Sequence, residues 1–168
     1  MGASRMLPAT TRGRRLCPGK EVVVGGFRRI LVGWDGSRDA EHALRAAAHL
    51  ASELGAELVV LGVLKRQRHV EALDEAEEDV ADRRRRVVGE IAAFARRAGV
   101  PWSESSRGET IVADDVATAL EEYARRHGFD VLVVGRHGLD RALHPRIGRV
   151  TEHEVRRSPC PVLVVGAD

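Results

Sequence analysis

The sequence contains few cysteines. Cys17 and Cys160 are the only two among its 168 residues, which excludes the disulfide framework that stabilises many small secreted domains. Neither belongs to a Cys-x-x-Cys pair or to the cysteine and histidine spacing of a zinc site. We therefore expect a cytoplasmic protein in a reducing compartment, and these residues predict no metal site.

Aromatic residues, long apolar runs and excess charge are also scarce. Aromatics make up 4% of the chain, so the core must rest on Ala, Val, Leu and Ile. No apolar run approaches the roughly 20 residues that span a bilayer, and the formal net charge is only +2. A nearly neutral chain gives no basis for bulk binding to nucleic acid or to membranes, and neither is expected as a partner.

The densest run of charge is Arg83 to Arg86, which lies in a predicted helix. Four consecutive residues wind around a helix instead of lying on one face, and acids such as Asp79 and Asp82 precede them. We interpret the run as a solvated, ion-paired surface and not as a nucleic-acid patch.

The first 26 residues differ in composition from the rest. They are rich in Arg, Gly, Pro and Thr and show no apolar periodicity, and they lack the apolar central region of a secretory signal. The composition predicts a disordered basic N-terminal extension at residues 1–26 that is dispensable for stability. One domain of ordinary size, residues 27–168, follows it.

Beyond residue 26, short apolar runs alternate with helical patterns. Continuous apolar runs suit strands that are covered on both faces, and the alternation predicts an α/β fold with a parallel sheet. Ser37 is predicted to cap the first helix and Gly55 to end it. The third strand is the least apolar and is expected at an edge. The predicted strands are 29–34, 57–64, 100–105, 131–134 and 162–165, and further helices are predicted at about 71–98, at 111–126 and after residue 148.

The most informative stretch is the glycine loop between the last two strands. Gly135 ends one apolar run, Gly138 follows, and Gly148 opens a short helix. Glycine allows a close backbone approach, and the free N–H groups at a helix N-terminus favour an anion. Arginines 136, 141, 146 and 149 accompany one acid, Asp140. The pattern predicts a phosphate cradle, although glycines that only make turns are the simpler alternative.

This loop resembles the nucleotide loop of the universal stress protein (UspA-like) family. The resembling features are the spacing Gly135-x-x-Gly138, nine residues, Gly148 and the stretch Pro159-Cys160-Pro161-Val162-Leu163-Val164-Val165. Upstream, Arg29 to Ser37 is similar to the family's first strand and turn. The resemblance extends from about Phe27 to Gly166, nearly the whole chain.

The resemblance implies a fold, a ligand and an assembly. The fold is a Rossmann-like open parallel five-stranded sheet of order 3-2-1-4-5 with helices on both faces. The ligand is ATP, with Mg²⁺ as a possible companion, and the assembly is a homodimer through Pro161, Val162, Leu163, Val164 and Val165. The implied nucleotide-binding residues are Gly33, Trp34, Asp35, Val63, Val134, Gly135, His137, Gly138, Gly148, Arg149, Val150 and Thr151.

Several of these residues have an ordinary structural alternative. Asp35 suits the ribose or a metal on the phosphates, but it also suits the cap of a helix turn. Val63 suits an adenine pocket and equally a core. His137 and His144 either donate hydrogen bonds to phosphate or are loop residues with no part in binding. These alternatives are open at the level of sequence.

One position departs from the family. ATP-binding members place Ser or Thr directly after the third glycine, where this chain has Arg149; Thr151 offers a hydroxyl nearby. The sequence predicts an ATP- or ADP-binding regulatory protein of the stress response. Because no nucleophile–base pair and no P-loop is evident, an enzyme is not favoured. The alternatives are a dimeric interaction module that binds no nucleotide and a slow ATP-hydrolysing enzyme.

Overall fold

The computed structural model describes residues 15–17, 20–21, 27–66, 73–139 and 146–167. Within the predicted N-terminal extension it describes two short antiparallel strands, β1 (Arg15–Cys17) and β2 (Lys20–Glu21). The remainder of that extension and most of the basic loop, including Arg141 and His144, lie outside the described residues.

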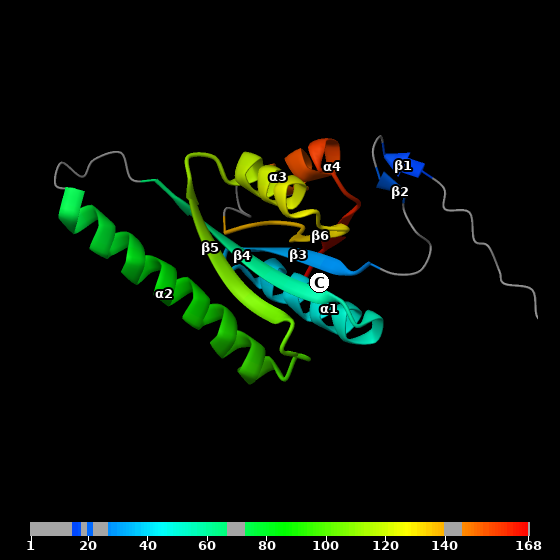
Figure 1. The fold of residues 1–168 in the computed structure, drawn as a ribbon, viewed down its shortest axis with the longest axis horizontal. Coiled ribbons are helices and arrows are strands. Elements are labelled where there is room, and N and C mark those ends of the chain that lie inside the picture. Colours follow the sequence, from blue (N-terminus) through cyan, green and yellow to red (C-terminus); the bar gives the residue numbers. More distant parts are fainter. Residues whose placement is uncertain (1–14, 18–19, 22–26, 67–72, 140–145, 168) are drawn as a thin grey trace, which may run out of the picture.

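The domain is built on one parallel sheet of five strands (Figure 1). Their spatial order is β5-β4-β3-β6-β7, which confirms the predicted order 3-2-1-4-5. The two edges are β5 and β7. The strands are β3 (Arg29–Trp34), β4 (Glu57–Lys65), β5 (Ser106–Ala113), β6 (Val131–Gly135) and β7 (Val162–Val165).

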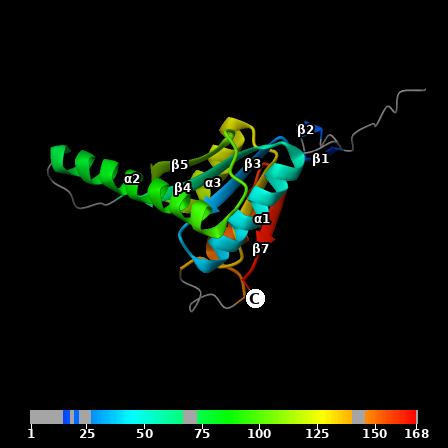
Figure 2. The ribbon, with the colours of Figure 1, turned by 90° about the horizontal axis from the view of Figure 1, so that it is seen from below.

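Helices cover both faces of this sheet. Helices α1 (Arg38–Leu54) and α2 (Leu73–Ala98) lie on one face, and α3 (Val116–His127) and α4 (Arg149–Arg157) on the other (Figures 1 and 2). Because side chains alternate along a strand, β3 contributes to two buried cores. Ile30 joins the core under α1 and α2, and Leu31 the core under α3 and α4.

The first helix begins and ends where the sequence predicts. The Ser37 side chain accepts a hydrogen bond from the Ala40 amide, which satisfies one of the free N–H groups of the first turn. Gly55 follows the helix with φ of 62°, in the left-handed region that favours glycine.

The prediction for the third strand is wrong in position. Residues 100–105 form no strand, and β5 instead covers Ser106–Ala113, pairing with β4 along its whole length. Ile111 and Val112 suggested a helix, but the nine-residue strand β4 needs a partner for its backbone groups. The next helix therefore begins at Val116, capped by Asp115. The predicted edge position of this strand is confirmed.

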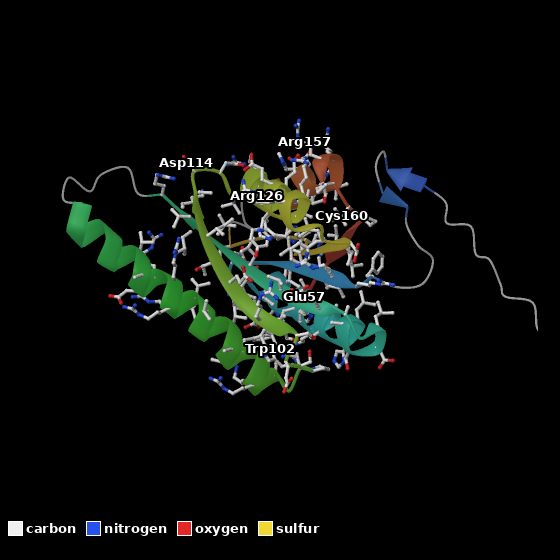
Figure 3. The ribbon with its side chains drawn as sticks, in the orientation of Figure 1. Glu57, Trp102, Asp114, Arg126, Arg157 and Cys160 are labelled. Atoms are coloured by element: carbon white, nitrogen blue, oxygen red, sulfur yellow. The ribbon has the colours of Figure 1, made fainter. Side chains whose placement is uncertain are left out.

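The two ends of the sheet differ in character. Asp114, directly after β5, marks the carboxyl ends of the strands, and Trp102, before β5, lies toward the opposite end (Figure 3). At the amino end, Glu57 forms ion pairs with Arg29, at 2.6 Å, and with Arg107. Hydrogen bonds from these two arginines lower the pKa of Glu57 to about 2.

Candidate functional site

A cavity of about 730 Å³ opens at the carboxyl end of the sheet. It lies between β3 and β6, where the strand order reverses and where open α/β sheets bind their ligands. The structure brings all of the predicted site residues to this one cavity. They are Gly33, Trp34, Asp35, Val63, Val134, Gly135, His137, Gly138, Gly148, Arg149, Val150 and Thr151.

One wall of the cavity is apolar. It is formed by Leu61 and Val63 of β4, Leu120 of α3 and Val134 of β6, all of which belong to or pack against the core under α3 and α4. Trp34 also lines the cavity, but it belongs to the opposite core, where its ring lies 5.5 Å from that of Phe94. The ring of Trp34 is therefore a core element more than a cavity wall.

The glycines of the loop are required by close packing and not by turn geometry. None of the three has a positive φ. A Cβ at Gly135 would lie 2.8 Å from the Asp39 carbonyl carbon, and one at Gly138 would lie 2.7 Å from Asp35 Oδ2. A Cβ at Gly148 would lie 3.3 Å from the Arg136 carbonyl oxygen. Side chains at these positions would push the loop away from its neighbours.

Asp35 joins the first turn to the glycine loop. Its Oδ1 accepts a hydrogen bond from the Ser37 amide at 2.9 Å, and its Oδ2 accepts one from the Leu139 amide at 3.2 Å. The cap of the turn is therefore one of its roles. Because each carboxylate oxygen has more than one acceptor site and the residue is exposed, Asp35 can still contact a ligand.

A buried pair, Asp39 and His137, is the feature that sequence reasoning missed. Asp39 Oδ2 accepts the His137 amide at 2.9 Å and lies 3.0 Å from His137 Nδ1, while Oδ1 accepts the Ala167 amide at 3.1 Å. Burial by itself would raise the pKa of Asp39, but the hydrogen bonds from Ala167 and His137 outweigh it and hold the pKa below its ordinary value. The partners lie 98 and 128 residues away in the chain, so no local motif signals them.

The proximity of Ser37 does not turn this pair into a catalytic triad. The Ser37 hydroxyl lies 3.4 Å from the carbonyl oxygen of His137 and accepts the Ala40 amide. A nucleophilic serine needs a hydrogen bond from its hydroxyl to the imidazole, and this hydroxyl is directed to the backbone instead.

The N-terminus of α4 opens on the cavity without a side-chain cap. Ser37 caps α1 and Asp115 caps α3, whereas the corresponding residue of α4 is Gly148, which provides no side-chain hydrogen bond. The first backbone bond of α4 runs from the Glu152 amide to the Gly148 carbonyl. The amides of residues 149–151 precede it and are left for another acceptor.

Among the described residues the charges around the cavity are mixed, and Arg149 is the one arginine of the described part of the loop that lines it. Arg136 does not line it; a Cβ at Gly166 would lie 3.0 Å from the Arg136 guanidinium carbon, so the side chain lies beside the C-terminal segment. Arg146 is exposed and does not line the cavity. Within the described ranges, the charged residues that line it are Lys65, Arg149 and Arg156 together with Asp35, Asp115 and Glu152.

Arg149 lies near the cap of α3. Asp115 accepts hydrogen bonds from Thr118, which lower its pKa; burial opposes this, and the positive charges of His153 and Arg149 lower it further. Arg149 is itself exposed. Its exposure and its charge effect on Asp115 are features of a side chain that is not buried in the glycine loop.

The described residues contain neither a metal-site cluster nor a helix that could cross a membrane. No cluster of three or more His, Cys, Asp or Glu in the described ranges has the arrangement of a metal site. None of the helices described here combines the length and apolar character of a bilayer-crossing segment.

Comparison with known proteins gives consistent matches. A sequence model of the universal stress protein family matches residues 26–166. Among curated proteins, the universal stress protein YxiE of Bacillus subtilis (strain 168) is 29% identical over 154 residues, which cover 83% of this chain and 99% of that protein.

Solved structures share the fold. Universal stress protein UspA from Lactobacillus plantarum matches with a TM-score of 0.68 and 25% identity over 83% of this chain and 98% of its own. A universal stress protein in complex with cAMP matches at 0.62 with 23% identity, over 83% and 97%. One from Archaeoglobus fulgidus in complex with dAMP matches at 0.58 with 18% identity, over 83% and 98%.

Proposed function

Since this chain belongs to the universal stress protein family, we propose that its cavity binds an adenine nucleotide, ATP or ADP. In this proposal the protein is a cytoplasmic regulator in the stress response, whose state depends on the bound nucleotide, and not primarily an enzyme. The observation that supports it most directly is the uncapped N-terminus of α4, which faces the cavity beside the glycine loop.

The chemistry of the cavity suits each part of a nucleotide. The apolar wall at Val63 and Leu120 matches a purine ring, and Asp35 offers acceptor sites to a ribose or, through Mg²⁺, to phosphate. The free amides at the start of α4 match an anion. Two structures of the same fold were solved with cAMP and dAMP, which supports the choice of an adenine nucleotide as ligand.

Arg149 is the residue on which ATP binding depends most. If its side chain filled the loop, the cavity would reject phosphate and the protein would be an interaction module. Its exposure and its position near Asp115 favour an open loop. An arginine at the mouth can then form charge-assisted bonds with the outer phosphates.

Titration calorimetry with ATP, ADP and cAMP, with and without Mg²⁺, tests the proposal. We expect ATP to bind the wild type, and Gly138→Val to abolish binding because the new side chain meets Asp35. Gly148→Ala, a smaller change, should weaken binding and serves as a second variant if Gly138→Val folds poorly. Gly89→Val is the matched control, because Gly89 is exposed on α2 and a Cβ there meets nothing within 4 Å.

The remaining outcomes separate the alternatives. A wild type that binds none of the three nucleotides contradicts the proposal. Turnover of ATP that is lost in Asp35→Ala would instead favour the slow hydrolytic enzyme.

A further inference from the structure

Asp39 connects α1, the glycine loop and the segment after β7. It lies in the first turn of α1 and is 2% exposed. Its carboxylate accepts the amide of His137 in the loop and the amide of Ala167 after β7. Asp39 does not line the cavity, so it can influence a ligand only through the residues that it holds.

The same carboxylate determines where the proton of the His137 ring lies. Asp39 Oδ2 is 3.0 Å from Nδ1 of His137, and the pKa of Asp39 is held below its ordinary value. An ionised carboxylate only accepts hydrogen bonds, so Nδ1 must carry the hydrogen. In a neutral imidazole the other nitrogen, Nε2, then carries a lone pair and is an acceptor.

The environment of Nε2 is that of a buried nitrogen at the cavity. His137 is 4% exposed and lines the cavity. Its Nε2 is buried and has no hydrogen-bond partner in the part of the chain that the structure describes. A buried acceptor without a donor is unfavourable, and a ligand group that donates to it would remove that penalty.

We propose that Asp39 is a positioning residue of the cavity, which holds the glycine loop and fixes His137 so that Nε2 accepts a hydrogen bond from the ligand. The ligand group is a hydroxyl or amino group, such as those of a ribose or an adenine. A neutral His137 held in this tautomer is not a donor to phosphate, the role that sequence reasoning suggested. The ligand contact rests on the proposed nucleotide function, whereas the tautomer and the loop contacts do not.

The first experiment uses the free protein at pH 7.5. Two-bond ¹H–¹⁵N correlation spectra distinguish the tautomers of each histidine, and the signals missing from His137→Gln identify His137. We expect His137 to carry its proton on Nδ1 in the wild type and to lose this fixed tautomer in Asp39→Ala. A wild-type ring that is protonated on Nε2, alone or together with Nδ1, overturns the proposal without any variant.

A matched control distinguishes the loss of the Asp39 contacts to the loop from the mere loss of a negative charge in the first turn of α1. Glu41 is the other acid there, is half-buried, and pairs only with Arg97 at 3.6 Å among the contacts described. Glu41→Ala should leave the His137 tautomer and the amide exchange of His137 unchanged. Asp39→Ala should increase that amide exchange at least tenfold; equal exchange in both variants would show that Asp39 does not hold the loop.

The second experiment tests the ligand contact. Binding of ATP is compared with 2′-deoxy-ATP, 3′-deoxy-ATP and the triphosphate of purine riboside, which lacks the amino group. One of these should bind the wild type about three- to tenfold more weakly, the range of one hydrogen bond, and the difference should vanish in His137→Ala. If every difference persists in His137→Ala, Nε2 does not contact the ligand. Absence of ATP binding to the wild type would contradict the nucleotide function and the contact, while the spectra still decide the role of Asp39.

Discussion

The hydroxyl of Thr151 donates a 2.7 Å hydrogen bond to the carbonyl oxygen of Gly135. The bond joins the first turn of α4 to the end of β6, and Thr151 is 3% exposed. Because a hydroxyl has a single hydrogen, Thr151 cannot also donate to a phosphate. It therefore does not replace the hydroxyl that the family places at Arg149, and a phosphate in this cavity would depend on backbone amides and on the Arg149 side chain.

Thr151→Val should destabilise the domain by about 1–2 kcal/mol, because the Gly135 carbonyl would lose its buried donor. Urea unfolding monitored by circular dichroism measures this. Thr110→Val is a suitable control, since Thr110 is half-buried in β5 and a β-branched residue suits a strand. Equal stability of Thr151→Val and wild type would show that the bond contributes nothing.

Arg149→Ser should reduce the salt dependence of ATP binding. The wild-type arginine adds a screened charge attraction to phosphate, so its affinity should fall more between 50 and 300 mM NaCl than that of the variant. Arg126→Ser removes an equal charge from an exposed position on α3 that does not line the cavity (Figure 3), and it should behave as wild type. If Arg149→Ser binds ATP and the wild type does not, the arginine side chain fills the glycine loop and blocks the phosphates.

The buried carboxyl group of Glu154 should make the stability of the domain depend on pH. It is 0% exposed and its carboxylate oxygens have no hydrogen-bond partner within the described ranges. Burial, with the negative charges of Glu121 and Asp115, raises its pKa to about 7. Between the ordinary pKa of about 4.5 and about 7, the unfolded chain has lost this proton while the folded chain keeps it. The contribution of Glu154 to stability therefore falls as the pH rises through this window and is constant above it.

Glu154→Gln should remove this slope. The variant should resemble wild type near pH 4.5 and exceed it by about 3 kcal/mol at pH 8, at about 1.4 kcal/mol for each pKa unit. Denaturant unfolding at a series of pH values measures the free energy of unfolding of both proteins. Contributions from the other titrating groups are the same in both and cancel in the difference. Glu152→Gln, on the exposed side of α4, should show no such trend. A parallel pH profile for Glu154→Gln and wild type would contradict the assignment.

Leu163→Lys should convert a homodimer into a monomer. β7 is an edge of the sheet, and Leu163 is 40% exposed on it; an apolar edge favours pairing with a second copy across a two-fold axis. Light scattering coupled to size exclusion measures the mass. Leu54→Lys is the matched control, because Leu54 is 42% exposed at the end of α1. A wild type that is monomeric at tens of micromolar excludes the dimer.

Elements with a strong local signal were predictable. The first helix lies between Ser37 and Gly55 as expected, because a side-chain cap and a left-handed glycine act within one turn of the helix. The sequence prediction misplaced β5 because it assigned Ile111 and Val112 to the following helix. Their β-branched side chains favour a strand, and pairing with β4 makes them part of one.

The sequence by itself predicted the alternation of strands and helices, and its resemblance to the universal stress protein family indicated part of the set of residues that line the cavity. The alternation follows from apolar periodicity, and the resemblance is carried by motifs such as the spacing of Gly135, Gly138 and Gly148; both are local properties of the chain. Only the tertiary structure decided what each side chain does. It placed Asp39 against His137 and committed the Thr151 hydroxyl to Gly135. The physical reason is that hydrogen bonds and burial depend on distances between atoms, and segments far apart in the chain come together only when the sheet forms.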